Sequence, residues 1–523
     1  MLRSVIAASG LGLALWVATL TGFSWPPPAP LPPPPSRVAV RIAGDSPVAI
    51  VDARFLSFAV DTAQVVGGEF WAPRESARGI LSTHAVARYD FARPRLRGLA
   101  AGLAPAYLRI GGTDADRTVY RMDAADGARV APPDGARWVL TRSRWDEVNA
   151  FARDVGVRLM FTLNAGPSAR DGDGAWDPAN ARALVRYTRD HDFPVDVWEL
   201  GNEINAFPLT HRRWLSAERY AADLRTARAL VDEQPGTARL AGVGSAFWPL
   251  LGEGRAITDR ALRAAPGALD IVTWHYYPQQ SHRCPLATRR ADRARTAAPD
   301  RLSDVDRWAA EVEAAARAHA PRAEVWLGET ASAQCGGEPG VSNTFADALW
   351  WLDELGRMAR RGQQVVVRQT LSGSDYGLID DETLQPNPSY WASWLWRRLM
   401  GTRVLDVAVA PSAPAVRAYA HCLADGAGAG EIALLLLNVD PAAAVTVDVG
   451  PGSRRVFRLR ADDLGLGARR VRVNGRALEA AADGTPPLLA TLVTDDDRLS
   501  LAPLSATFVV LPSAGAAACG QSR

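Results

Sequence analysis

Two stretches of the sequence carry its strongest structural signal: VDVWELGNE at Val195–Glu203 and EVWLGET at Glu324–Thr330. Each is a short β-rich run with a glycine and a glutamate at its end. Six similar runs are Phe55–Asp61, Ala106–Gly112, Val157–Ala165, Arg239–Ser245, Ile271–Tyr277 and Val365–Thr370. Helical patterns between them include Ser216–Glu233, Ser303–Ala318 and Thr344–Arg361, and a last one lies at Ser389–Met400. Eight such strand–helix units predict an α/β fold, a (β/α)8 barrel over residues 55–400.

The pattern changes after Gly401. Short strands separated by Gly, Pro and Asp turns replace the strand–helix units, and Asn474-Gly475 is a hairpin signal. The expected strands are Val416–Cys422, Glu431–Val439, Val445–Val449, Val456–Leu459, Val471–Val473 and Ala506–Leu511. They predict a C-terminal β-sandwich over residues 401–523. We expect the segment 37–54 to add an N-terminal strand to it, at Val38–Ile42, because this run precedes the barrel.

The N-terminus has the pattern of an export signal. Arg3 precedes the run Val5–Trp25, which contains no charged residue. Its length suits an uncleaved membrane anchor as well as a cleaved signal peptide, so both remain open for residues 1–25. A Pro-rich linker follows at 26–36 and would hold the body of the protein away from a membrane. We therefore expect an exported protein, periplasmic or secreted, with a possible membrane tether.

Composition excludes several classes of protein. The 523 residues include 59 basic and 57 acidic side chains, a net charge of +2, which argues against a nucleic-acid-binding protein. With 48% hydrophobic residues the chain can bury a large core. The sequence contains no HExxH motif and no cysteine spacing of a zinc site, so we expect no metal and no cofactor. We expect a monomer.

The four cysteines are candidate disulfides, because thiols of exported proteins are usually oxidised. Four cysteines allow three connectivities. Pairing by region is the simplest of them and would join Cys284 to Cys335 and Cys422 to Cys519.

Two glutamates at strand ends are the candidate catalytic groups. The active site of a (β/α)8 barrel lies at the C-terminal ends of its strands, where Glu203 and Glu329 are placed. Two carboxylates facing each other are what glycoside hydrolysis requires, one protonated to donate to the leaving oxygen and one ionised to attack the anomeric carbon. A retaining enzyme needs them about 5–5.5 Å apart.

Other polar residues of the strands would support this pair. Glu199 shares strand parity with Glu203 but lies deeper, where an interior cation suits it better. Arg109 is a plausible partner for Glu199 or Glu329, since an unpaired buried charge is costly. Strand six places His275 and Tyr277 on one side, and Tyr277 could donate a hydrogen bond to Glu329 and keep it ionised. A merely structural role for His275 is the alternative.

These motifs resemble the heparanases of glycoside hydrolase family 79. The resemblance lies in WELGNE, in VWLGETASA, SNTFADALWWLDELG and VVVRQ, and in PAYLRIGGT, FLSFAVD and VTWHYY. It covers almost everything after the Pro-rich linker. It implies a barrel with a β-sandwich, and a retaining mechanism on β-linked glucuronic acid.

The resemblance also implies roles for individual residues. Glu203 would be the proton donor and Glu329 the nucleophile, and Asn202 would hydrogen-bond the sugar 2-hydroxyl. The other residues at positions that contact the glucuronate are Asp61, Thr113, Tyr277 and Tyr376. In the family, backbone N–H groups of a Gly-rich loop hold the uronate carboxylate. Here that loop includes Gly336, and Cys335 stands where the family has glycine. We hypothesise that a Cys284–Cys335 disulfide fixes this loop.

The sequence leaves three functions open, two of them enzymatic and one of them glycan binding. The first hypothesis is an endo-β-glucuronidase acting on heparan sulfate or a similar acidic glycan. The second is an exo-acting β-glucuronidase. A non-catalytic glycan-binding protein would need neither glutamate. Arg212, Arg213, Arg283, Arg289 and Arg290 could form a basic rim for sulfate groups, or simply be solvated surface residues.

Overall fold

The structure is a computed structural model that describes residues 33–71, 83–123, 131–233, 236, 238–250, 252–424, 430–462 and 465–520. The predicted export signal or anchor at 1–25 lies outside these residues, as does most of the linker. Within the described ranges, no helix is both long enough and apolar enough to span a membrane.

Eight parallel strands close into a barrel, as predicted. Their order around the barrel is β10-β11-β12-β13-β14-β3-β6-β9. Their bounds are β3 Leu56–Asp61, β6 Tyr107–Gly111, β9 Arg158–Leu163, β10 Val195–Leu200, β11 Arg239–Phe247, β12 Ile271–Tyr276, β13 Glu324–Thr330 and β14 Val365–Arg368. All eight strands lie where the sequence predicted them, and the (β/α)8 barrel is confirmed.

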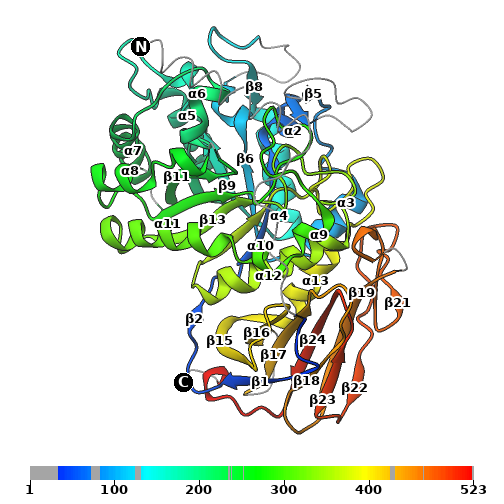
Figure 1. Cartoon of the computed structure of the whole chain (residues 1–523). Helices are drawn as coiled ribbons and strands as arrows, with labels where there is room; N and C mark the ends of the chain where they lie inside the picture. Colours follow the sequence, from blue (N-terminus) through cyan, green and yellow to red (C-terminus); the bar gives the residue numbers. More distant parts are fainter. Residues whose placement is uncertain are drawn as a thin grey trace, which may run out of the picture.

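Eight main helices follow these strands and cover the outside of the barrel (Figure 1). Their bounds are α3 Pro94–Ala101, α4 Arg142–Val155, α5 Ala179–Asp190, α7 Ala217–Asp232, α8 Thr258–Ala264, α11 Val305–His319, α12 Phe345–Arg360 and α13 Pro388–Leu399. Helix α4 illustrates how the sequence sets the ends. Thr141 Oγ1 accepts a hydrogen bond from the Arg144 N–H at the start, and Gly156 ends the helix at φ +77°.

The barrel interior has an apolar layer below a polar one. The apolar layer takes one or two side chains from every strand: Ala59, Tyr107, Met160, Val197, Ala241, Ile271, Trp326, Val365 and Val367. Because side chains alternate along a strand, the residues two positions further on also point inward. Four of these are Arg109, Thr162, Glu199 and Thr273, which form the polar floor of the site.

A register shift in β13 turns Glu329 into the barrel. Simple alternation from Trp326 would point Gly328 and Thr330 inward and Glu329 outward. The pairing of β12 with β13 slips by one residue at this point, from Trp274–Leu327 to His275–Glu329. Glu329 therefore faces the interior, while Thr330 faces outward and donates to the Tyr276 carbonyl at 2.8 Å. Such bulges commonly re-aim a side chain at an active site.

The C-terminal region is a sheet that lies beside the barrel (Figure 1). Its strand order is β21-β20-β19-β24-β17-β16-β15-β1-β18-β23, with β2 on β15 and β22 on β19. The bounds are β1 Arg37–Ala43, β2 Ala49–Ile50, β15 Met400–Ala410, β16 Val416–Leu423, β17 Ile432–Asn438, β18 Val445–Asp448, β19 Arg454–Ala461, β20 Val471–Val473, β21 Arg476–Ala477, β22 Leu492–Thr494, β23 Arg498–Leu501 and β24 Ser505–Leu511.

The long strand β15 lets this sheet fold back on itself as a sandwich. Residues 404–405 pair with β16, whereas residues 406–410 pair with β1. The predicted N-terminal strand thus joins the C-terminal sheet. Leu434 and Leu436 on one face of β17 pack into the core of the sandwich, and Leu435 and Leu437 on the other face pack towards the barrel helices. The boundaries drawn from the sequence at 54/55 and 400/401 stay a prediction.

Both predicted disulfides are formed. Cys422–Cys519 joins β16 to the short helix at Ala517–Cys519 near the C-terminus. Cys284–Cys335 joins two loops at the C-terminal face of the barrel, one after β12 and one after β13.

Candidate active site

Arg109 lies at the centre of the polar layer and contacts both deep carboxylates. Its Nε donates to Glu199 Oε2 at 2.9 Å, its Nη1 to Glu329 Oε2 at 2.7 Å and its Nη2 to Asn202 Oδ1 at 2.9 Å. The guanidinium has no solvent exposure. One buried cation therefore orients three side chains from β10, β13 and the turn after β10.

Glu199 is a structural anion. Besides Arg109, the hydroxyls of Thr162 and Thr273 donate to its carboxylate at 2.8 and 2.9 Å. Burial raises the pKa of Glu199, but the charge of Arg109 and these hydrogen bonds outweigh it, so the pKa lies below its usual value. With every neighbour a donor, this carboxylate is held ionised and offers no proton.

Glu329 is more deeply buried than Glu203, the other candidate catalytic glutamate. Tyr277 Oη donates to its Oε1 at 2.5 Å, and Arg109 holds its Oε2. The two donors fix the orientation of the carboxylate and place a positive charge against it. This is the arrangement that a nucleophilic carboxylate needs.

Glu203 stands opposite in a different environment. It follows β10 in the left-handed region, at φ +51°, which turns its side chain over the barrel mouth. Its side chain keeps 13% of its surface exposed, and His275 Nδ1 lies 3.2 Å from its Oε1. Burial raises the pKa of Glu203, the hydrogen bond from His275 opposes the rise, and the negative charge of Glu329 adds to it; the net direction is upward. A raised pKa suits a general acid.

His275 is neutral and donates to Glu203. Its Nε2 faces the Arg109 Nη2 at 3.5 Å, and an arginine nitrogen can only donate. The proton of the imidazole therefore resides on Nδ1, which is the nitrogen facing Glu203. Burial lowers the pKa of His275, in spite of the opposing hydrogen bond to Glu203, and the positive charge of Arg109 lowers it further.

The spacing of the two glutamates suits glycoside hydrolysis with retention. One carboxylate oxygen of Glu203 and one of Glu329 lie no more than 4.8 Å apart, which is shorter than the separation of about 6.5–9.5 Å in an inverting pair. The side chains of Glu203, His275 and Glu329 lie close enough together to hold a metal ion. The guanidinium of Arg109 touches the same set, and its fixed charge opposes a second cation there.

Asn202 is held in place through its side-chain oxygen. Its Oδ1 accepts from Arg109 and from the Gly112 N–H at 3.2 Å, which directs its Nδ2 away from the floor. Among the described residues, no acceptor binds this Nδ2. Asp116, which sequence reasoning missed, holds the turn in place by accepting from the Asn202 N–H at 2.8 Å. Burial raises the pKa of Asp116 to about 7.

Asp61 is the last residue of β3, and Thr113 begins the short helix that follows the neighbouring strand β6. Asp61 ends β3, and its Oδ1 accepts from the Ala63 N–H at 2.9 Å. A Cβ on Gly112 would lie 2.0 Å from Asp61 Oδ2, so only glycine fits here, and Thr113 follows directly. Gln369 Nε2 lies 3.5 Å from the same Asp61 oxygen. Its Oε1 is buried and without a protein partner in the described part of the chain, which adds a site residue that the sequence analysis did not name.

Tyr376 and the loop of Gly336 lie beside each other at the C-terminal face of the barrel. Tyr376 packs with Phe70, Trp248 and Tyr277 in an apolar cluster at the barrel mouth. Its backbone N–H donates to the Gly336 carbonyl at 3.1 Å. Tyr277 and Tyr376 were predicted, whereas Phe70 and Trp248 were not, because no spacing pattern distinguishes these two from core residues.

The prediction that Arg283 belongs to an exposed basic rim is wrong. Arg283 is 1% exposed, because its Nη1 donates to the Gly337 carbonyl and its Nη2 to Asp375. Arg212 and Arg213 are exposed, as a rim would require, and Arg289 and Arg290 are half-buried.

Comparison with known proteins places the chain among glycosidases. "Glycosyl hydrolase family 79, N-terminal domain" matches residues 37–356. The heparanase of Gallus gallus is 31% identical over 481 residues, which span 82% of this chain and 89% of that protein. The baicalin-beta-D-glucuronidase of Scutellaria baicalensis is 30% identical over 464 residues, 80% of this chain and 82% of that protein.

A solved structure supports the fold. The 4-O-alpha-L-rhamnosyl-beta-D-glucuronidase of Fusarium oxysporum 12S superposes with a TM-score of 0.62 and 18% identity, over 91% of this chain and all of that one. At that identity the likeness concerns the fold alone.

Proposed function

Because the chain belongs to glycosyl hydrolase family 79 and is a retaining glycoside hydrolase, we propose that it cleaves β-linked glucuronic acid within acidic glycans. It would act as an endo-β-glucuronidase. The observation that carries the proposal is the pair Glu203 and Glu329, which lie close together in opposite environments. We propose no metal and no cofactor for the reaction.

In the proposed reaction Glu329 attacks the anomeric carbon and Glu203 protonates the leaving oxygen. The bond from the anomeric carbon to that oxygen breaks, and a glycosyl ester to Glu329 forms. Glu203, now ionised, takes a proton from water, and the resulting hydroxide attacks the same carbon and frees Glu329. The neutral His275 supports both halves, because its N–H accommodates either form of Glu203 and competes for no proton.

The glucuronate would occupy the space between Asn202, Asp61, Thr113 and Tyr376. Asn202 Nδ2 is free to bind the 2-hydroxyl, as described above. The backbone N–H groups of Cys335, Gly336 and Gly337 donate to no acceptor in the described chain, and they would receive the uronate carboxylate. Successive backbone N–H groups in a turn form such anion-binding concavities.

Endo action is supported by residues beyond this pocket. Trp214 is 66% exposed on the segment that follows Glu203, and the guanidinium of Arg255 lies 5.3 Å from its ring centre. Arg212 and Arg213 are exposed beside it. An exposed aromatic ring flanked by arginines suits further residues of an acidic glycan. The 31% identical heparanase of Gallus gallus favours the same class of substrate.

The second candidate is an exo-acting β-glucuronidase. The baicalin-beta-D-glucuronidase of Scutellaria baicalensis is equally related, at 30% identity. We further propose that the protein is exported, which agrees with its two disulfides.

A paired assay separates these candidates. Wild-type protein and Glu329→Gln are incubated with heparan sulfate, followed by size-exclusion chromatography, and with an aryl β-glucuronide. Shortening of the polymer with little aryl release supports endo action. Aryl release with intact polymer supports exo action. If the wild type gives neither signal, or if Glu329→Gln retains activity, the proposed function is wrong.

A further inference from the structure

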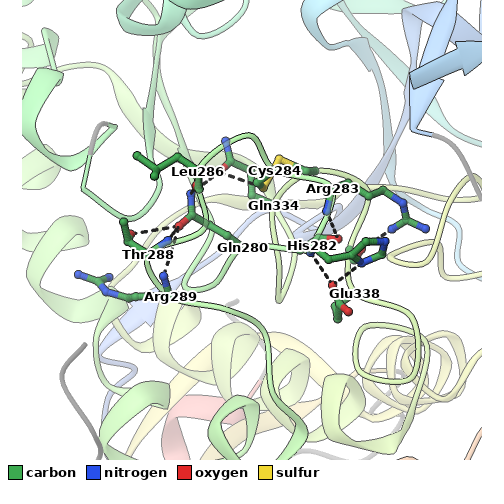
Figure 2. Close-up of a disulfide and its surroundings, with 12 residues drawn as sticks. Gln280, His282, Arg283, Cys284, Leu286, Thr288, Arg289, Gln334 and Glu338 are labelled. Atoms are coloured by element: carbon green, nitrogen blue, oxygen red, sulfur yellow. Dashed lines mark hydrogen bonds and ion pairs between the residues drawn. A yellow bond between two sulfur atoms is a disulfide. The ribbon is translucent and has the colours of Figure 1, made fainter. Parts of the chain in front are cut away.

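We propose that the Cys284–Cys335 disulfide is a positioning device that holds the uronate-binding loop in its working conformation. This inference rests on the proposed function, since it assigns to that site the residues that shape its carboxylate subsite. The disulfide connects the loop after β12 to the loop that directly follows Glu329 (Figure 2).

The loop contains three consecutive residues in the left-handed region. Their φ angles are +61° at Cys335, +82° at Gly336 and +77° at Gly337. Glycine adopts this conformation without a steric penalty, but a residue with a Cβ, such as cysteine, does not. The first of the three positions is therefore unfavourable unless another interaction holds it.

The close packing around Gly336 and Gly337 also leaves no space for a side chain at either position. A Cβ on Gly336 would lie 2.5 Å from Ser374 Oγ and 2.6 Å from Trp71 Cβ. A Cβ on Gly337 would lie 2.7 Å from the Tyr376 N. The loop is thus tightly packed against Trp71, Ser374 and Tyr376. We expect a change in the backbone conformation of Cys335 to move the N–H groups of the loop relative to Glu329.

The loop after β12 holds this strained segment with several contacts besides the disulfide (Figure 2). The His282 N–H and ring both reach Glu338 Oε2, at 2.8 and 3.0 Å. The Ser281 N–H donates to the Gln334 carbonyl at 3.2 Å. The buried Arg283 donates to the Gly337 carbonyl at 2.6 Å. These contacts lie before and after Cys335, and the disulfide is the one that acts on the left-handed cysteine itself.

The same arrangement explains how a residue other than glycine can stand at position 335. The cross-link restrains Cys335 from leaving the left-handed region, so the backbone of residues 335–337 keeps its conformation. We therefore expect the disulfide to contribute to binding of the uronate carboxylate, and not to the chemistry at Glu203 and Glu329.

The test compares substitutions that keep or remove the Cβ at position 335. The first variant is Cys284→Ser with Cys335→Ser, and the second is Cys284→Ser with Cys335→Gly. The control is Cys422→Ser with Cys519→Ser, which removes the distant disulfide. Kinetics are measured on an aryl β-glucuronide, and binding of free D-glucuronate and of D-glucose is measured by NMR titration.

We expect the serine pair to raise KM and weaken glucuronate binding about tenfold, because hydrogen bonds to a charged group are lost, with kcat within about twofold. The serine–glycine pair should recover most of the affinity, and the control should keep its KM. Binding of D-glucose, which has no carboxylate, should be unaffected.

An unchanged KM in the serine pair, or no recovery with glycine at position 335, overturns the inference. A fall in kcat at constant KM does so too. Should the serine pair fail to fold, the single change Cys284→Ser is held to the same expectation. Absence of wild-type activity on the glucuronide together with absence of glucuronate binding instead overturns the proposed function.

Discussion

Replacing His275 with leucine tests the assignment of Glu203 as the acid. The change removes the Nδ1–H that donates to Glu203 Oε1 at 3.2 Å. A hydrogen bond to a charged group is worth about 1.5–3 kcal/mol, and about 1.4 kcal/mol corresponds to one pKa unit. Because the contact is long and the Glu203 side chain is 13% exposed, we take the lower end, about one unit.

The direction of the shift follows from which form the hydrogen bond favours. Burial raises the pKa of Glu203, and the His275 donor lowers it by favouring the carboxylate. Loss of that donor raises the pKa further. Because the acid must be protonated to act, His275→Leu stays active to a higher pH than the wild type. The basic limb of its kcat/KM profile therefore moves up by about one pH unit.

The measurement is the pH profile of kcat/KM on an aryl β-glucuronide. His275→Asn is the matched control, because its amide N–H can take the place of Nδ1–H, and its basic limb should stay near that of the wild type. If the basic limb of His275→Leu does not move, or moves to lower pH, the assignment of Glu203 as the acid that His275 contacts is wrong. Equal shifts in the two variants would also contradict it.

Three further changes have expected outcomes. Arg109→Met leaves Glu199 buried without its cation and should lower the free energy of unfolding in urea by about 3–5 kcal/mol; a loss below 1 kcal/mol would contradict the pairing. Cys422→Ser with Cys519→Ser opens a loop with a sequence separation of 97 residues, and should cost about 4–5 kcal/mol of stability, measured in the same way. Asn202→Ala should lower kcat/KM at least about tenfold on an aryl glucuronide, but not on its 2-deoxy analogue; equal losses on both substrates would rule out a contact with the 2-hydroxyl.

The architecture could be predicted from the sequence because its signals are local. Runs such as Ile271–Tyr276 are apolar and bounded by helical patterns, and all eight barrel strands follow from that regularity. The same alternation places Arg109 and Glu199 in the interior. The strand β15 at Met400–Ala410 was not predicted, because it follows helix α13 without a turn signal.

The geometry of the site depended on departures from regularity, which sequence patterns do not reveal. Glu329 points inward only because the pairing of β13 with β12 shifts by one residue beside Gly328. Glu203 is placed at the barrel mouth by its own left-handed backbone conformation. Arg283 was assigned to an exposed rim by its charge alone. Its burial depends on acceptors at Gly337 and Asp375, which are distant in sequence.

The most direct test of the account is to trap the glycosyl–enzyme ester. Wild-type protein is incubated with 2-deoxy-2-fluoro-β-D-glucuronyl fluoride, digested and examined by mass spectrometry, with Glu203→Gln and Glu329→Gln alongside. We expect a single label on the peptide that contains Glu329, and none in Glu329→Gln. A label on Glu203, or no label in a protein that hydrolyses an aryl β-glucuronide, would contradict it.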